Sequence, residues 1–120
     1  AIVGVKNTQV NPQVNVFRYQ APEVISDEPI SKASDVYSWA MTSLEIITGQ
    51  PPFHAWTSPG VLIQHITKNE TPVRSDYQSP VLDKHPEIWD LFVRCWNRDP
   101  TQRPTALEVI KAMEKIPAME

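Results

Sequence analysis

The sequence has one cysteine, three glycines and no long run of apolar residues. Cys95 has no partner for a disulfide within the chain, which fits a reducing intracellular compartment, and we expect a cytoplasmic location. No apolar run approaches the roughly 20 residues of a membrane-spanning helix, so no membrane segment is expected. Because the glycines stand only at positions 4, 49 and 60, the chain has no Gly-x-Gly loop to cradle a nucleotide phosphate.

Positive charge is also scarce. The chain has 11 lysines and arginines against 14 acidic residues, a formal net charge of −3 at pH 7. Nucleic acid binding needs a basic footprint, so no nucleic acid partner is expected. The three histidines have no ligand spacing with one another or with Cys95, and no metal site is predicted.

Proline is abundant, with 12 residues that divide the chain into segments. Valines alternate with polar residues in 1–16, around Asn11-Pro12, and we expect an extended loop there. From about residue 35 to residue 48, apolar side chains recur at three- and four-residue steps, which predicts a helix. Gly49 and the prolines after it end this helix. Its apolar surface extends around much of the cylinder, so a central position in the fold is expected.

Further helices follow the central one. Ser58-Pro59 opens a helix that reaches about residue 67, and Pro86 opens another that keeps helical spacing until Pro100. Residues 67–84 are polar and interrupted by prolines, which predicts a loop. The fold class is therefore mainly α, with helices packed behind a long N-terminal loop.

A capping box starts the last predicted helix. In Thr105-Ala106-Leu107-Glu108, the threonine hydroxyl and the glutamate carboxylate satisfy each other's free backbone N–H groups. The helical spacing predicts that Leu107, Ile110 and Met113 face inward.

Two separated motifs carry a family resemblance. Residues 17–23 read Phe-Arg-Tyr-Gln-Ala-Pro-Glu, and residues 95–104 read Cys-Trp-Asn-Arg-Asp-Pro-Thr-Gln-Arg-Pro. In this order, with a long apolar helix between them, they resemble the C-terminal part of a eukaryotic protein kinase catalytic domain. The second motif is similar to the tyrosine-kinase-like and tyrosine kinase branches. The resemblance covers residues 1–116 and leaves 117–120 as a tail.

The resemblance implies an extended activation segment over residues 1–23, which ends in Ala-Pro-Glu, and a helical large lobe over residues 24–116. It also implies that Glu23 pairs with Arg103. A guanidinium can bind a carboxylate with two parallel hydrogen bonds, which suits a partly buried pair. The alternative is that Glu23 only stabilises a helix N-terminus while Arg103 is solvated.

Other site residues follow from the same resemblance. Asp35 corresponds to the aspartate that anchors the catalytic loop, although it could equally be an ordinary acidic residue at a helix start. Thr8 is the candidate activation phosphosite, and the alternative is an unmodified loop residue. The helix at residues 58–67 would offer a docking face to larger partners. The floor that receives the peptide substrate would include Val16, Phe17, Arg18 and Tyr19.

The residues that handle ATP are missing from the sequence. It contains no His-Arg-Asp and no Asp-Phe-Gly, so no catalytic residue is predicted, and the chain itself is expected to bind no cofactor. The family implies ATP and Mg²⁺ for a full-length parent. The leading hypothesis is a truncated piece of an ATP-dependent serine/threonine protein kinase that supplies only docking and structural parts, with protein substrates as partners.

Two alternatives stay open. The first is a pseudokinase or truncated scaffold that binds other proteins through its helical surface. Val16 favours it, because active serine/threonine kinases usually have a threonine there whose hydroxyl bonds the catalytic aspartate and lysine. The second is an unrelated helical interaction domain, which the ordered set of motifs disfavours. The oligomeric state is left open.

Overall fold

The computed structural model of the chain describes residues 12–117. The described part is helical and contains no strand, which confirms the predicted mainly helical fold class. Its α-helices are α1 (Pro12–Phe17), α2 (Pro22–Ile25), α3 (Lys32–Thr48), α4 (Pro59–Thr67), α5 (Pro80–Lys84), α6 (Pro86–Cys95) and α7 (Ala106–Glu114). Two short 3₁₀ helices, η2 (Arg74–Asp76) and η3 (Pro100–Gln102), lie in the connections.

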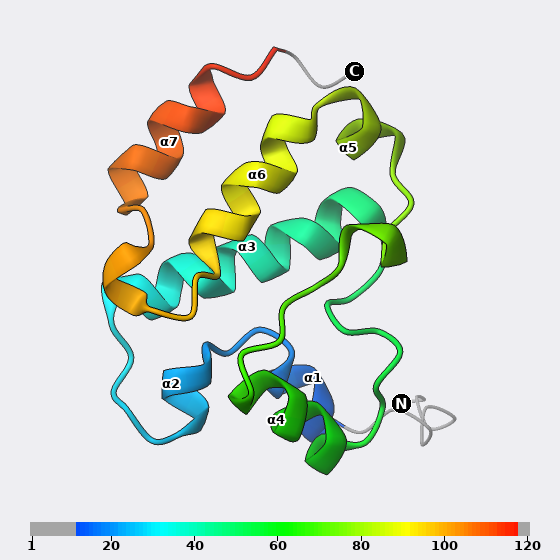
Figure 1. The fold of residues 1–120 in the computed structure, drawn as a ribbon, viewed down its shortest axis with the longest axis vertical. Helices are drawn as coiled ribbons and strands as arrows, with labels where there is room; N and C mark the ends of the chain where they lie inside the picture. Colours follow the sequence, from blue (N-terminus) through cyan, green and yellow to red (C-terminus); the bar gives the residue numbers. More distant parts are fainter. Residues whose placement is uncertain (1–11, 118–120) are drawn as a thin grey trace, which may run out of the picture.

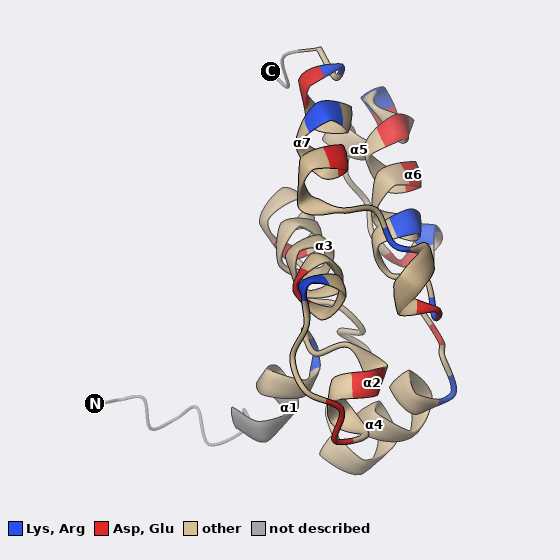
Figure 2. Cartoon of the chain, turned by 90° about the vertical axis from the view of Figure 1, so that its left-hand side faces the viewer, with Lys and Arg blue, Asp and Glu red and all other residues tan. Residues whose placement is uncertain are grey.

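Helix α3 crosses the middle of the fold and separates two groups of helices (Figure 1). On one side α6 contacts α3, α5 and α7, and on the other side α4 contacts α1 and α2. The same division is visible from the side, where acidic and basic residues both occur on α6 and α7 (Figure 2). No helix within residues 12–117 is both long and apolar enough to cross a membrane.

The two ends of α3 are set by local hydrogen bonds. At the start, the Ser34 backbone N–H donates to the Ser31 hydroxyl at 3.1 Å, and the Ser31 N–H donates to the Ser34 hydroxyl at 2.8 Å. This pair, rather than Asp35, caps the helix, so α3 begins three residues before the predicted start. At the end, Gly49 adopts φ 76°, and its N–H donates to the Glu45 carbonyl at 2.7 Å, as the glycine predicts.

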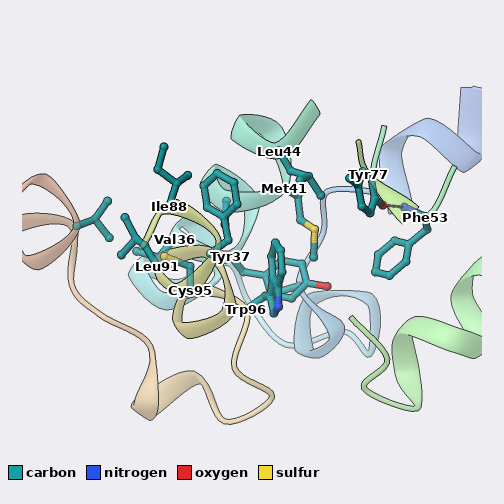
Figure 3. Close-up of a cluster of buried hydrophobic side chains, with 14 of the residues drawn as sticks. Val36, Tyr37, Met41, Leu44, Phe53, Tyr77, Ile88, Leu91, Cys95 and Trp96 are labelled. Atoms are coloured by element: carbon teal, nitrogen blue, oxygen red, sulfur yellow. Dashed lines mark hydrogen bonds between the residues drawn. The ribbon is translucent and has the colours of Figure 1, made fainter. Parts of the chain in front are cut away.

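The core lies between α3 and α6. Ala40, Met41 and Leu44 of α3 are completely buried, and their side chains lie near those of α6 (Figure 3). Burying one large apolar side chain contributes about 1.5–3 kcal/mol, so this contact dominates the stability of the fold. The α6 and post-α6 residues that complete it are Ile88, Leu91, Phe92, Cys95 and Trp96.

Two predicted loops contain helix instead. Residues 12–16 belong to α1, so the extended loop does not run through residue 16. Pro12 was interpreted as a break, but a proline in the first turn of a helix costs no hydrogen bond. Residues 80–84 form α5, for which Ser79 supplies the cap by accepting the Leu82 N–H at 3.2 Å.

The prediction for the buried face of α7 was wrong. Leu107 is 60% exposed and Ile110 53% exposed, whereas Val109 is only 7% exposed. Val109, Ala112 and Met113 pack against the core, so Met113 is the one member of the predicted set that faces inward. Helical spacing fits several faces of a short helix equally well, and the docking of α7 on α6 decides among them.

Candidate functional site

Glu23 and Arg103 form a two-bond ion pair. Glu23 lies in α2, and Arg103 directly follows η3. Arg103 Nη1 donates to Glu23 Oε2 at 2.7 Å, and Nη2 donates to Oε1 at 2.9 Å. The arginine side chain is 0% exposed and that of the glutamate 19% exposed. The contact joins residues 80 positions apart, as the resemblance implies.

Arg103 also binds backbone oxygens on either side of this pair. Its Nη1 donates to the Ala33 carbonyl at 3.1 Å, and its Nε donates to the Asn97 carbonyl at 2.9 Å. The guanidinium carbon lies 5.1 Å from the centre of the Tyr37 ring, within range of a cation–π interaction. One side chain therefore joins α2, the start of α3 and the loop after α6.

The environment of Glu23 favours its ionised form. Burial alone would raise the pKa of this carboxyl, but the Arg103 guanidinium more than offsets the burial, and the net pKa lies below the ordinary value. The carboxylate is therefore charged at neutral pH, and the pair contributes Coulomb energy as well as hydrogen bonds.

The four residues predicted to receive a peptide do not share one surface. Val16 and Phe17 close α1, and Arg18 and Tyr19 lie in the turn that follows. Val16 is 54% exposed, Phe17 and Tyr19 are half-buried, and Arg18 is buried. Any direct contact with a peptide at this segment would therefore come from Val16, Phe17 and Tyr19.

Tyr19 is fixed on α3 from both of its ends. Its hydroxyl donates to the Glu45 carboxylate, and its backbone carbonyl accepts the Ser38 hydroxyl at 2.7 Å. Burial, with a smaller contribution from Glu45, raises the pKa of Tyr19 to about 12. No sequence signal pairs residues 26 positions apart, so this contact was not predicted.

Asp35 lies exposed in the first turn of α3. Within residues 12–117, no side-chain or backbone donor binds its carboxylate. The residue lines a groove of about 650 Å³ between α3 and α7. Apart from Asp35 and Lys32 at the start of α3, the groove is mostly apolar, with Val36, Trp39, Val109 and Ile110 among its lining residues.

The remaining candidates divide simply. Thr8 lies outside the described residues. Among residues 12–117, no group of three or more histidine, cysteine or acidic side chains could hold a metal ion. The imidazoles have protein neighbours instead: His54 lies 3.1 Å from the Asp76 carbonyl oxygen and His65 lies 2.9 Å from Glu70 Oε2.

Comparison with known proteins decides the family. The profile of the protein kinase domain matches residues 3–113. This chain belongs to the protein kinase family. The match includes the Ala-Pro-Glu motif, the central helix and the arginine that binds Glu23, so the ion pair lies within the kinase homology.

Individual relatives of this kinase-family chain are serine/threonine kinases by name. It is 37% identical over 101 residues to the serine/threonine-protein kinase VIK of Arabidopsis thaliana, covering 83% of this chain and 22% of the relative. It is 34% identical over 96 residues to human mitogen-activated protein kinase kinase kinase 7, covering 79% and 15%. Similarity to the Arabidopsis kinase STY17 is 29% over 104 residues, covering 87% and 17%. The chain thus spans about a fifth or less of the length of these relatives.

Proposed function

We propose that this chain is the C-terminal part of the catalytic domain of an ATP-dependent serine/threonine protein kinase. In this proposal, residues 1–23 are the activation segment, residues 24–116 are the helical large lobe, and the full-length protein works inside the cell on protein substrates. The observation that carries it is the pair between Glu23 and Arg103, which binds the Ala-Pro-Glu motif to the end of the lobe at 2.7 and 2.9 Å. The names of the relatives support the serine/threonine assignment.

The chemistry would need parts that lie outside this chain. Bound ATP and Mg²⁺ would supply the phosphoryl group and neutralise the charge that develops on it. The contribution of residues 12–117 would be positioning. Tyr19 is bonded to α3 through its hydroxyl and its carbonyl, so the segment next to it is held in one conformation before a peptide arrives.

Within this function, the exposed Val16 and half-buried Phe17 would give a peptide an apolar surface at the end of α1. Helix α4 would serve as a docking face for larger partners. The exposed carboxylate of Asp35 would accept backbone N–H groups of the catalytic loop. Thr8 would be the phosphosite of the activation segment, because a phosphate adds charge and three acceptor oxygens that an arginine can bind. Mass spectrometry of the protein from activated cells tests Thr8, and persistent absence of phosphate there would remove this part of the proposal.

A binding scaffold without phosphotransfer is the second candidate. Val16 favours it, since a valine side chain can neither donate nor accept the hydrogen bond that the threonine of active family members makes. In this alternative the helical surface recruits proteins, and Glu23 and Arg103 have a purely structural role.

Phosphotransfer by the full-length product distinguishes the two functions. Purified full-length protein is incubated with Mg²⁺, radiolabelled ATP and matched peptides that carry serine, threonine or tyrosine as the only acceptor. We expect label on the serine and threonine peptides. A folded, nucleotide-binding protein that transfers no label but still captures protein partners would favour the scaffold, and label on tyrosine alone would overturn the serine/threonine assignment.

A further inference from the structure

Arg18 is a buried cation in the turn between α1 and α2. The residue is 5% exposed, and its guanidinium meets the loop that joins α3 to α4, residues 52–56 here. Nη1 donates to the carbonyl oxygens of Pro52, at 3.0 Å, and Phe53, at 2.8 Å. Nη2 donates to the carbonyl oxygen of Trp56 at 2.9 Å. One planar cation therefore holds three backbone carbonyls of a single loop at fixed distances.

The 52–56 loop has a strained backbone that needs such contacts. Phe53 adopts φ 57°, in the left-handed region that bulky residues rarely occupy. The Trp56 N–H donates to the Phe53 carbonyl at 3.0 Å. The Phe53 N–H donates to the Tyr77 hydroxyl at 2.8 Å (Figure 3). The Phe53 carbonyl thus accepts from both Arg18 and Trp56, which ties the turn to the arginine.

The same loop reaches helix α4 through its aromatic rings. Phe53 and Trp56 stack with centroids 5.5 Å apart and an interplanar angle of 16°. Trp56 in turn stacks on His65 of α4, with centroids 3.8 Å apart and an angle of 3°. Helix α4 also contacts α1, which carries Val16 and Phe17. Arg18 is therefore the polar connection in a closed circuit formed by α1, the 52–56 loop and α4.

We propose that Arg18 is a positioning residue that fixes the peptide-receiving segment Val16–Tyr19 and the α4 docking face relative to each other, through the carbonyls of Pro52, Phe53 and Trp56. This proposal rests on the substrate role of residues 16–19 proposed above. Arg18 does not touch the substrate, because its guanidinium is consumed by the loop. It sets the distance between two surfaces that one protein substrate would contact together.

The geometry explains why arginine is required at this position. Loss of the guanidinium leaves the carbonyls of Pro52 and Trp56 without this donor, in a loop that already holds an unfavourable φ at Phe53. A lysine keeps the charge but concentrates its donors on a single nitrogen, so it cannot reproduce a fork that reaches three separated oxygens. The charge alone is therefore not sufficient, and the shape of the side chain decides.

The test uses the full-length protein with Arg18→Gln and Arg18→Lys. Arg74→Gln is the matched control, because Arg74 also fixes a loop, donating to the Tyr77 carbonyl at 2.5 Å and to Asp83 at 2.6 Å, but touches neither 16–19 nor 52–56. Two readouts are collected. Amide hydrogen exchange is followed in peptides that cover residues 16–20 and 52–57, and steady-state kinetics gives KM for a protein substrate, KM for ATP, and kcat.

Both Arg18 variants are expected to exchange faster in the two peptides together, while Arg74→Gln leaves them protected. We expect KM for the protein substrate to rise about tenfold in both Arg18 variants, with KM for ATP unchanged and kcat changed less. A rise no larger than in Arg74→Gln, or wild-type behaviour of Arg18→Lys, would overturn the proposal. If Arg18→Gln does not fold, the milder Arg18→Lys carries the test.

The exchange readout keeps this proposal separate from the proposed function. A full-length protein without any kinase activity would contradict the enzyme assignment, yet joint deprotection of 16–20 and 52–57 would still support the connection. Deprotection of only one of the two peptides would contradict the connection even in a fully active kinase.

Discussion

At the scale of single residues, Arg103 makes the contacts on which the fold depends most. Its guanidinium is completely enclosed, and its hydrogen bonds reach Glu23, Ala33 and Asn97. A buried cation without its counter-ion is far more costly than an exposed one, because the desolvation of the charge is no longer compensated. The pair therefore matters more through the cost of breaking it than through its net attraction.

Glu23→Gln should destabilise the full-length catalytic domain by about 3 kcal/mol, since it leaves the Arg103 charge buried and unneutralised. Asp83→Asn is the control. It breaks the Arg74 pair, in which the aspartate side chain is 76% exposed, and should cost less than about 1 kcal/mol. Urea denaturation of the two variants measures the difference, and equal losses would contradict the structural role of the Glu23 pair.

The same carboxylate predicts an acid dependence. The pKa of Glu23 is lower in the fold than its ordinary value, whereas in the unfolded chain a glutamate titrates near about 4.3. Its contribution to stability is therefore complete above that value and is lost as the pH falls through the lower, folded pKa. Wild-type protein should lose more urea stability than Glu23→Gln over this acidic window. Parallel losses in the two proteins would assign the acid sensitivity to other groups.

Cys95 should be inert in the native protein. Burial raises the pKa of its thiol to about 11, against smaller opposing effects of Arg94 and Arg103, and the residue is completely buried. At about pH 8 the thiol is therefore protonated as well as covered. Alkylation followed by peptide mass spectrometry should label Cys95 only after urea is added, and rapid labelling of the folded protein would show that this part of the core opens.

The sequence was most informative where a motif named both partners of a contact. The two motifs predicted that Glu23 and Arg103 meet, and the burial of Cys95 and Trp96 followed from helical spacing. The direction of Arg18 was not predictable, because a motif assigns a residue to a segment and does not say which neighbour will face it. Its partners are backbone carbonyls, which every sequence supplies and none marks.

At the scale of helices, starts and ends were predicted better than faces. Gly49 and the Thr105–Glu108 capping box mark helix ends through local backbone chemistry, and both act as expected. The inward face of α7 depends instead on how the helix meets α6, and the sequence pattern assigned Leu107 and Ile110 wrongly. Helix α1 was missed because six residues carry no clear period and gain their stability from contact with α4.

Two substitutions near the start of α7 test this distinction. Thr105→Ala removes the hydroxyl that accepts the Glu108 N–H at 3.1 Å and should cost about 1 kcal/mol. Leu107→Ala changes a residue that is 60% exposed and should stay within about 0.5 kcal/mol of wild type. Urea denaturation measures both, and a larger loss for Leu107→Ala would restore the original prediction of an inward leucine.

At the scale of the whole molecule, the fold leaves an apolar surface open. The groove of about 650 Å³ between α3 and α7 is lined by Val36, Trp39, Val109 and Ile110. Soluble monomers rarely expose connected apolar patches of more than a few hundred Å². The relatives that the chain matches are about five times as long or longer, so the full-length protein has ample further chain to cover such a surface.

Residues 1–120 expressed alone should therefore bind a hydrophobic dye such as ANS and should aggregate or melt without a sharp transition. Replacing Trp39 by Gln, at the groove, should lower the dye signal, whereas replacing the exposed Val73, which does not line the groove, should leave it unchanged. A monomeric chain with a cooperative melt and no dye binding would contradict this expectation.

The central claim is that these 120 residues carry the substrate platform of a kinase without its nucleotide site. Calorimetric titration with Mg-ATP tests it most directly when the isolated chain and the full-length protein are compared under the same conditions. We predict saturable binding by the full-length protein and no heat of binding by the chain alone. Saturable binding of Mg-ATP by the isolated chain would contradict the account.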